Sequence, residues 1–166
     1  MKLSLAYTWS CSPAAFWELY FDPEFAVRMH LEALGSLAAE VVSTEGDLST
    51  GLVRTLTYAQ KPNMPGPVRK IFGEEITTTE VSTFDPATST TTFVMTPGTM
   101  ADKTHLTGAI ALSDAGGVTA ETFSLEAKVK IFGVGPVVER FIEHQAREIQ
   151  QKSVAFMRQE LGLSPQ

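Results

Sequence analysis

Residues 118–162 read VTAETFSLEAKVKIFGVGPVVERFIEHQAREIQQKSVAFMRQELG, and this stretch decides the fold. Its first part, 118–131, alternates apolar and polar side chains, which predicts a strand with one buried face. Its second part repeats apolar side chains at helical spacing. Gly135 is the expected N-cap, Pro136 the first helical residue and Gly162 the stop, with Pro165 close behind it. A long strand that leads directly into a long helix indicates a helix packed across a sheet.

The helix is expected to bury one side and to keep the other in water. Pairs of opposite charge four residues apart, Glu143 with Arg147 and Glu148 with Lys152, belong on the wet side. A helix of about 26 residues is roughly 39 Å long, enough to cross a whole sheet. The apolar stripe consists of Val138, Phe141, Ile142, Ile149, Ser153 and Phe156.

Outward from this stretch, the N-terminus supplies another strand and two short helices. Residues 2–10 alternate, with Leu3, Leu5, Tyr7 and Trp9 on the apolar face. Ser-Pro at 12–13 and Asp-Pro at 22–23 are each an N-cap followed by proline at the first helical position, so we expect helices over 13–20 and 23–34.

The central part of the chain predicts hairpins, because strand-like runs alternate with short turn signals. The patterns together predict an α+β fold: a curved antiparallel sheet of about seven strands gripping the long C-terminal helix, with two short helices after the first strand. We expect one domain over 1–166. The expected central strands are 37–44, 51–60, 74–84, 89–96, 101–113 and 118–131, with the first turn at 45–47.

Composition and charge exclude several classes of protein. The 166 residues carry a formal net charge of -6, which argues against nucleic-acid binding because phosphate backbones attract basic surfaces. The single cysteine, Cys11, cannot form an internal disulfide. We find no signal peptide and no apolar run of the roughly 20 residues that span a bilayer, so a cytoplasmic location is expected. The oligomeric state is left open.

Sequence motifs for catalysis, cofactor binding and zinc binding are absent, so we name no catalytic residue, cofactor or metal. His144 and Glu148 lie four residues apart on the long helix, but such pairs are far more often solvated than bound to a metal. His30 is expected at the surface or near a helix cap, and His105 on the outer face of its strand. A plain buried thiol is expected for Cys11.

The segment 61–67, KPNMPGP, is a loop because three prolines and a glycine exclude a strand interior. Met64 at its tip, beside Ile71 and Phe72, suggests either an apolar lid edge or a rigid loop folded onto the body. In the first case, the stretch from Met64 to Phe72 would make transient contact with a membrane surface.

The order of elements resembles the START-like superfamily (SRPBCC, helix-grip), which includes the major birch-pollen allergen, polyketide cyclases and lipid-transfer domains. The likeness is carried by the alternating first strand, PGP at 65–67 with KIFG at 70–73, and KIFGVGP at 130–136. Within the superfamily the chain is most similar to the uncharacterised DUF2505 family. This resemblance implies a cavity between the curved sheet and the last helix, holding an apolar small molecule such as a lipid, sterol or polyketide.

Strand alternation indicates which side chains would line such a cavity. We expect Arg54, Tyr58, Thr78 and Thr104 to supply its few polar groups, and the small residues Gly108 and Ala127 to leave space in the interior. The alternative is a fully packed core with Arg54 at the rim. The ligand-binding candidates are Arg54, Leu56, Tyr58, Thr78, Phe93, Leu106, Phe123, Leu125, Phe141, Ile142 and Ile149.

Three functions are compatible with the sequence. The first is non-catalytic binding of a hydrophobic small molecule. The second is a polyketide cyclase or aromatase-type enzyme that uses Tyr58 and Arg54, with His105 joining them if the strand register differs. The third is an interaction module without a cavity, which would bind a partner through an exposed apolar patch.

Overall fold

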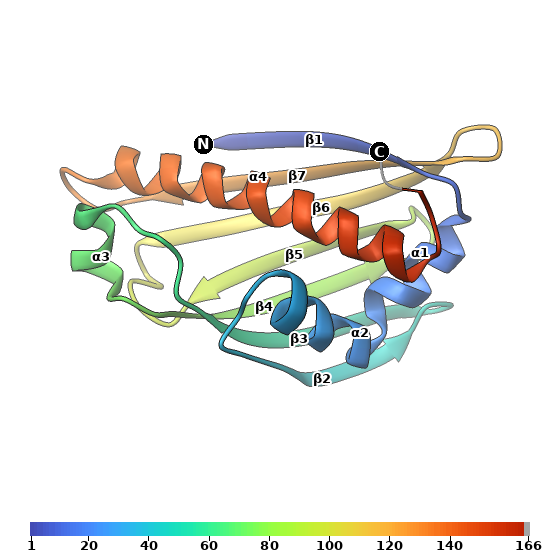
Figure 1. Cartoon of the computed structure of the whole chain (residues 1–166), viewed down its shortest axis with the longest axis horizontal. Helices are drawn as coiled ribbons and strands as arrows, with labels where there is room; N and C mark the ends of the chain where they lie inside the picture. Colours follow the sequence, from blue (N-terminus) through green and yellow to red (C-terminus); the bar gives the residue numbers. More distant parts are fainter. Residues whose placement is uncertain (165–166) are drawn as a thin grey trace.

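A computed structural model describes residues 1–164, so Pro165 lies outside the described residues. In these residues seven strands form one antiparallel sheet in the order β1-β7-β6-β5-β4-β3-β2 (Figure 1). The elements in chain order are β1 (Lys2–Trp9), α1 (Pro13–Phe21), α2 (Pro23–Arg28), η1 (Met29–Ala33), β2 (Ala38–Asp47), β3 (Gly51–Gln60), α3 (Gly66–Phe72), β4 (Ile76–Asp85), β5 (Thr90–Pro97), β6 (Thr104–Asp114), β7 (Thr119–Val129) and α4 (Gly135–Glu160).

The sheet curves and the long helix α4 crosses it, which confirms the expected fold class (Figure 1). Strands β2 to β7 each pair with the next strand in the chain. The last strand, β7, also pairs with the first strand, β1. The odd-numbered residues of β1 and β7 lie opposite one another, as in Leu3 with Leu125 and Trp9 with Thr119. These side chains share the face that α4 covers.

The two short helices start where proline and a capping side chain predict them. Ser12 Oγ accepts the backbone N–H of Ala15 at 3.2 Å, and Asp22 Oδ1 accepts that of Phe25 at 2.6 Å. The second helix changes after Arg28 into the π-helical turn η1, which the sequence did not indicate. The N–H of Leu34 bonds to the carbonyl of Met29, five residues earlier.

The turn between β2 and β3 is displaced from its predicted position at 45–47. β2 continues to Asp47, and the turn consists of 48–50. The carboxylate of Asp47 accepts the N–H groups of Ser49 at 2.8 Å and Thr50 at 2.9 Å. Aspartate at the first position of a turn forms this local bond, which made Asp47 the start of the turn and not its end.

Both ends of α4 are tied to the sheet. At the N-terminal end, Glu139 accepts hydrogen bonds from the Met1 ammonium at 2.8 Å and from the Val129 N–H at 3.0 Å. At the C-terminal end, the Arg158 guanidinium donates to the Thr8 carbonyl at 2.8 Å. The N-cap is Val134 and not Gly135 as expected. A Cβ at Gly135 would lie 2.8 Å from the Val129 carbonyl oxygen, so glycine permits close approach there.

Two apolar clusters hold the interior together. The larger one joins the aromatic residues of α1 and α2 to the sheet and includes Trp9, Phe16 and Trp17. The smaller one lies under α3 and the start of α4, where Val68, Phe72 and Val138 meet.

The smaller cluster also contains Met64, whose side chain is only 3% exposed. Of the two alternatives for this loop, the structure shows the one in which the loop folds onto the body, because Met64 reaches the same apolar cluster as Val68 and is not exposed. Phe132, in the connection between β7 and α4, is instead fully exposed. Contact of the 64–72 segment with a membrane stays a prediction. None of the helices in residues 1–164 is long and apolar enough to cross a membrane.

Gly108 leaves no space in the interior, contrary to expectation. The Phe93 ring lies over it, and a Cβ built on Gly108 would collide with that ring and with the Ser124 carbonyl oxygen. Phe93 and Gly108 are paired across β5 and β6. Because Gly108 has no side chain, the Phe93 ring occupies the space next to its Cα.

We expect Gly108→Ala to lower the free energy of unfolding by about 1–3 kcal/mol, because the added methyl group overpacks the interior. Chemical denaturation followed by circular dichroism measures this change. Gly66→Ala is the matched control, since a Cβ at Gly66 has no atom within 4 Å. Equal stabilities of the two variants would contradict this account of Gly108.

Candidate functional site

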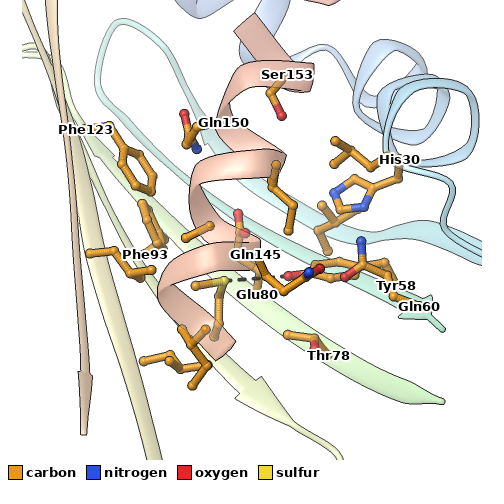
Figure 2. Close-up of a pocket in the computed structure, with 18 of the residues that line it drawn as sticks. His30, Tyr58, Gln60, Thr78, Glu80, Phe93, Phe123, Gln145, Gln150 and Ser153 are labelled. Atoms are coloured by element: carbon orange, nitrogen blue, oxygen red, sulfur yellow. Dashed lines mark hydrogen bonds between the residues drawn. The ribbon is translucent and has the colours of Figure 1, made fainter. Parts of the chain in front are cut away.

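A cavity of about 230 Å³ lies between the curved sheet and α4. Strands β3 to β7 form its floor, the middle of α4 forms its roof, and η1 and α3 contribute at the sides. The cavity has an apolar part and a more polar part (Figure 2). Phe93 and Phe123 lie on one side of α4, whereas Tyr58, Glu80 and Gln145 gather on the other.

Every ligand-binding candidate from the sequence contributes to the lining of this cavity. Strand alternation and the apolar stripe of one helix predict this set, and the curvature of the sheet brings the strand residues and the helix residues together. The residues are Arg54, Leu56, Tyr58, Thr78, Phe93, Leu106, Phe123, Leu125, Phe141, Ile142 and Ile149. Thr104 lines the cavity as well, whereas Phe156 packs away from it, stacked on Phe25 with ring centroids 5.5 Å apart.

Arg54 is a buried cation and not a rim residue, since its side chain is 3% exposed. Its Nη1 donates to the Tyr20 carbonyl at 2.6 Å, and its Nη2 lies 3.8 Å from Glu80 Oε1. The guanidinium also contacts the faces of two aromatic rings, those of Tyr20 and Phe21, at 4.9 and 5.0 Å from their centroids. Glu80 accepts a further bond from Ser82 Oγ at 2.8 Å.

His30 is buried beside Tyr58, which corrects its expected surface position. The two ring centroids are 4.3 Å apart, and His30 Nδ1 lies 3.2 Å from Ser36 Oγ. Burial, reinforced by the positive charge of Arg54, lowers the pKa of His30 to about 4, so the ring is neutral at pH 7. Tyr58 donates to Met95 Sδ at 3.6 Å, and burial raises its pKa.

Glu121 is a buried carboxyl group at the β1–β7 side of the cavity. Its Oε2 accepts the indole N–H of Trp9 at 2.7 Å. Burial raises its pKa to about 7, although the Trp9 hydrogen bond and the Arg158 charge oppose the shift. The Arg158 guanidinium lies over the Trp9 ring at 5.3 Å from the centroid. A carboxyl group with this pKa exchanges a proton near neutral pH.

Three functional candidates were missed at the sequence level. Glu121 has the same parity as Phe123 and Leu125, so alternation alone would have placed it inside. Glu80 shares its face with Thr78 in the same way. His30 gave no such signal, because only the π-helical turn and the packing of η1 direct it inward.

The remaining reactive side chains lie apart from the cavity lining. His144 and His105 are exposed, and the described residues contain no group of three His, Cys, Asp or Glu side chains that could hold a metal ion. His105 therefore lies on the outer face, as expected. Cys11 is a half-buried free thiol whose pKa is raised by burial.

The arrangement can hold an apolar molecule, supply hydrogen bonds and exchange a proton. The side chains of Phe93, Phe123 and Ile149 offer apolar surface. Tyr58 and Thr104 offer hydroxyl groups, and Glu121 is the group whose protonation changes near neutral pH.

Comparison with known proteins gives a family and a fold. The family model described as a protein of unknown function (DUF2505) matches residues 4–161. No curated protein matches the chain.

Solved structures with the same architecture cover nearly the whole chain. A protein from Thermus thermophilus shares 14% identity with a TM-score of 0.68, over 96% of this chain and 95% of its own. The Zhui aromatase/cyclase from a Streptomyces species shares 12% identity with a TM-score of 0.68, over 97% and 95%. A START superfamily protein from Mycobacterium smegmatis shares 12% identity with a TM-score of 0.64, over 95% and 97%. These likenesses establish a START-type fold.

Glu121 should make stability depend on pH. Its pKa is about 7 in the folded chain against 4.5 as the ordinary value, so between these values the folded state binds the proton that the unfolded state releases. The free energy of unfolding therefore falls as pH rises from about 4.5 to about 7. We expect Glu121→Gln to remove a fall of up to about 3 kcal/mol, measured as the difference in urea stability between the variant and the wild type across this range.

His30 titrates with the opposite sign, because its pKa is lowered from 6.5 to about 4. The contribution of His30 cancels in the difference between the wild type and Glu121→Gln, because both proteins contain His30. Glu126→Gln changes an outward carboxylate on the same strand, whose pKa is lowered by Lys128, and should leave the slope as in the wild type. If Glu121→Gln and the wild type have parallel profiles, Glu121 is not a buried titrating group.

Proposed function

The chain belongs to the DUF2505 family, and we propose that it binds a small hydrophobic molecule in the cavity under α4. The observation that carries this proposal is an apolar cavity with a few polar side chains between sheet and helix. Such a composition is typical of small-molecule sites. The resemblance to START-type structures is consistent with it.

The size of the cavity restricts the ligand. Its volume of about 230 Å³ lies below the roughly 300–1,000 Å³ of typical ligand pockets. A compact molecule of one or two rings, or a short alkyl chain, fits this space better than a whole membrane lipid. Phe141, Ile149 and Ser153 of α4 line the cavity and are half-buried, so we expect a ligand to enter beside the middle of the helix.

A cavity-free interaction module is a weaker proposal. Scattered apolar side chains are exposed on the described surface, but their exposure is ordinary for a globular protein. The interior space and its buried polar groups have no use in such a module. Burying the Arg54 and Glu80 charges costs free energy that an apolar interior would avoid.

Glu121 supports a second candidate, a cyclase-type enzyme. A carboxylate with a pKa near 7 could remove a proton from the carbon between two ketone groups of a substrate. The resulting enolate would form a carbon–carbon bond with another carbonyl of the same chain, whose oxygen takes up the proton, and loss of water would follow. The likeness to the Zhui aromatase/cyclase makes this chemistry worth testing.

The test of the second candidate is conversion of a linear poly-β-ketone thioester, followed by mass spectrometry for loss of water. An enzyme should convert it faster than buffer does, and Glu121→Gln should abolish the excess rate. Conversion at the same rate with the variant, or no excess rate with the wild type, would leave binding as the function.

Filling the cavity should remove binding of an apolar probe. We expect Ala146→Phe to weaken binding of a naphthalene-based fluorescent probe at least about tenfold, because Ala146 lines the cavity and the new ring occupies it. Native mass spectrometry of the purified wild type should detect a co-purified small molecule that the variant lacks. Titration of probe fluorescence measures the first effect.

Ala155→Phe is the matched control, since Ala155 lies on the same helix but is exposed and does not line the cavity. It should bind the probe like the wild type. Thermal unfolding of both variants checks that they fold. If the wild type neither binds the probe nor carries a co-purified molecule, the proposed function is wrong.

A further inference from the structure

Thr104 presents a buried hydroxyl group without a partner at the cavity. Its side chain is 4% exposed, and its Oγ1 makes no hydrogen bond among the described residues. A buried hydroxyl group without a hydrogen bond destabilises the folded state, because it has lost its hydrogen bonds to water and gained no other. Thr104 lines the cavity, so rotation about its Cα–Cβ bond would bring the hydroxyl group to a molecule inside the cavity.

Two further hydroxyl groups lie on neighbouring strands. Tyr58 of β3 pairs with Thr78 of β4, and both line the cavity. Tyr58 donates to Met95 Sδ at 3.6 Å, a weak acceptor that a better one would replace. Thr78 pairs in turn with Pro97 of β5, the strand that lies between β4 and β6. We call Tyr58, Thr78 and Thr104 the hydroxyl row.

The charges at the cavity are already balanced. Arg54 is the only Lys or Arg among the lining residues, and Glu80 lies 3.8 Å from it. Arg54 retains one buried N–H, on Nε, without a partner, but the charge of its guanidinium is matched. Beside the cavity, the charge of Arg158 acts on Glu121. A ligand anion would therefore meet no uncompensated cation, and a ligand cation would meet only Glu80, which Arg54 matches, and Glu121, on which Arg158 acts.

We infer that the ligand is an uncharged molecule with an apolar body and a neutral oxygen group, a ketone or hydroxyl, that bonds to the hydroxyl row. This inference rests on the proposed function and names its ligand class. A ketone oxygen accepts bonds from hydroxyl groups and leaves the charge of the cavity unchanged. An apolar molecule without oxygen would leave Thr104 unsatisfied, and a carboxylate would bury an extra charge.

Four naphthalene probes with similar groups on the same ring carbon separate these cases: acetylnaphthalene, ethylnaphthalene, naphthoate and naphthylethylammonium. Titration at about pH 8 keeps the last two charged. We expect acetylnaphthalene to bind roughly tenfold more tightly than ethylnaphthalene, because its ketone oxygen accepts a hydrogen bond from a hydroxyl group of the row, of which that of Thr104 is otherwise unsatisfied. Both charged probes should bind more weakly than acetylnaphthalene.

Thr104→Val removes the hydroxyl group and keeps the shape of the side chain. It should lower the preference for acetylnaphthalene over ethylnaphthalene several-fold, and Tyr58→Phe should lower it as well. Thr91→Val is the matched control. Thr91 is fully buried, and its Oγ1 also has no hydrogen bond among the described residues, but it does not line the cavity. The preference should be unchanged in this variant.

Equal binding of acetylnaphthalene and ethylnaphthalene would overturn the inference while leaving the proposed function intact. Tighter binding of naphthoate or of naphthylethylammonium would overturn it in the same way, and so would an unchanged preference in Thr104→Val. If none of the four probes binds to the wild type, the proposed function fails, and the inference fails with it.

Discussion

The attachment of α4 at its two ends is the constraint on which the rest of the structure depends. Glu139 ties the first turns of the helix to the Met1 ammonium and the Val129 N–H, and Arg158 ties the last turns to the carbonyl of Thr8. Between these points the sheet curves away, and the only buried residues of the helix are Ala146 and, next to Arg158, Met157. The helix therefore bridges the sheet in its middle, and the cavity is the space beneath this bridge.

The N-terminal segment provides aromatic partners for the two buried arginines. Arg54 contacts the rings of Tyr20 and Phe21, and Arg158 lies over Trp9. Each guanidinium also donates to a backbone carbonyl and acts on a carboxylate, Glu80 or Glu121. Such buried pairs contribute little net stability compared with an apolar interior. Both pairs lie around one cavity, and under the proposed function they would select against charged ligands.

Much of the candidate site could be predicted because strands alternate. Once Leu52, Leu56 and Tyr58 are assigned to the inner face of β3, Arg54 must join them, and its 3% exposure agrees. The same rule places Glu121 inside with Phe123, although a carboxyl group is rarely buried. His30 could not be predicted, since its helix is apolar on most sides and its direction depends on a π-helical turn.

The sequence by itself determined the kind and order of the elements, because period-2 and helical patterns, proline at N-termini and glycine at stops act over a few residues. It also determined which side chains share a face of a strand. Only the tertiary structure decided what those faces enclose. Gly108 was expected to leave a void, but Phe93 of the adjacent strand fills it. The sequence left the loop around Met64 either as a lid edge or folded onto the body, and a cluster that includes the distant Val138 buries Met64. Space and burial depend on neighbours far apart in the chain, so a local pattern cannot specify them.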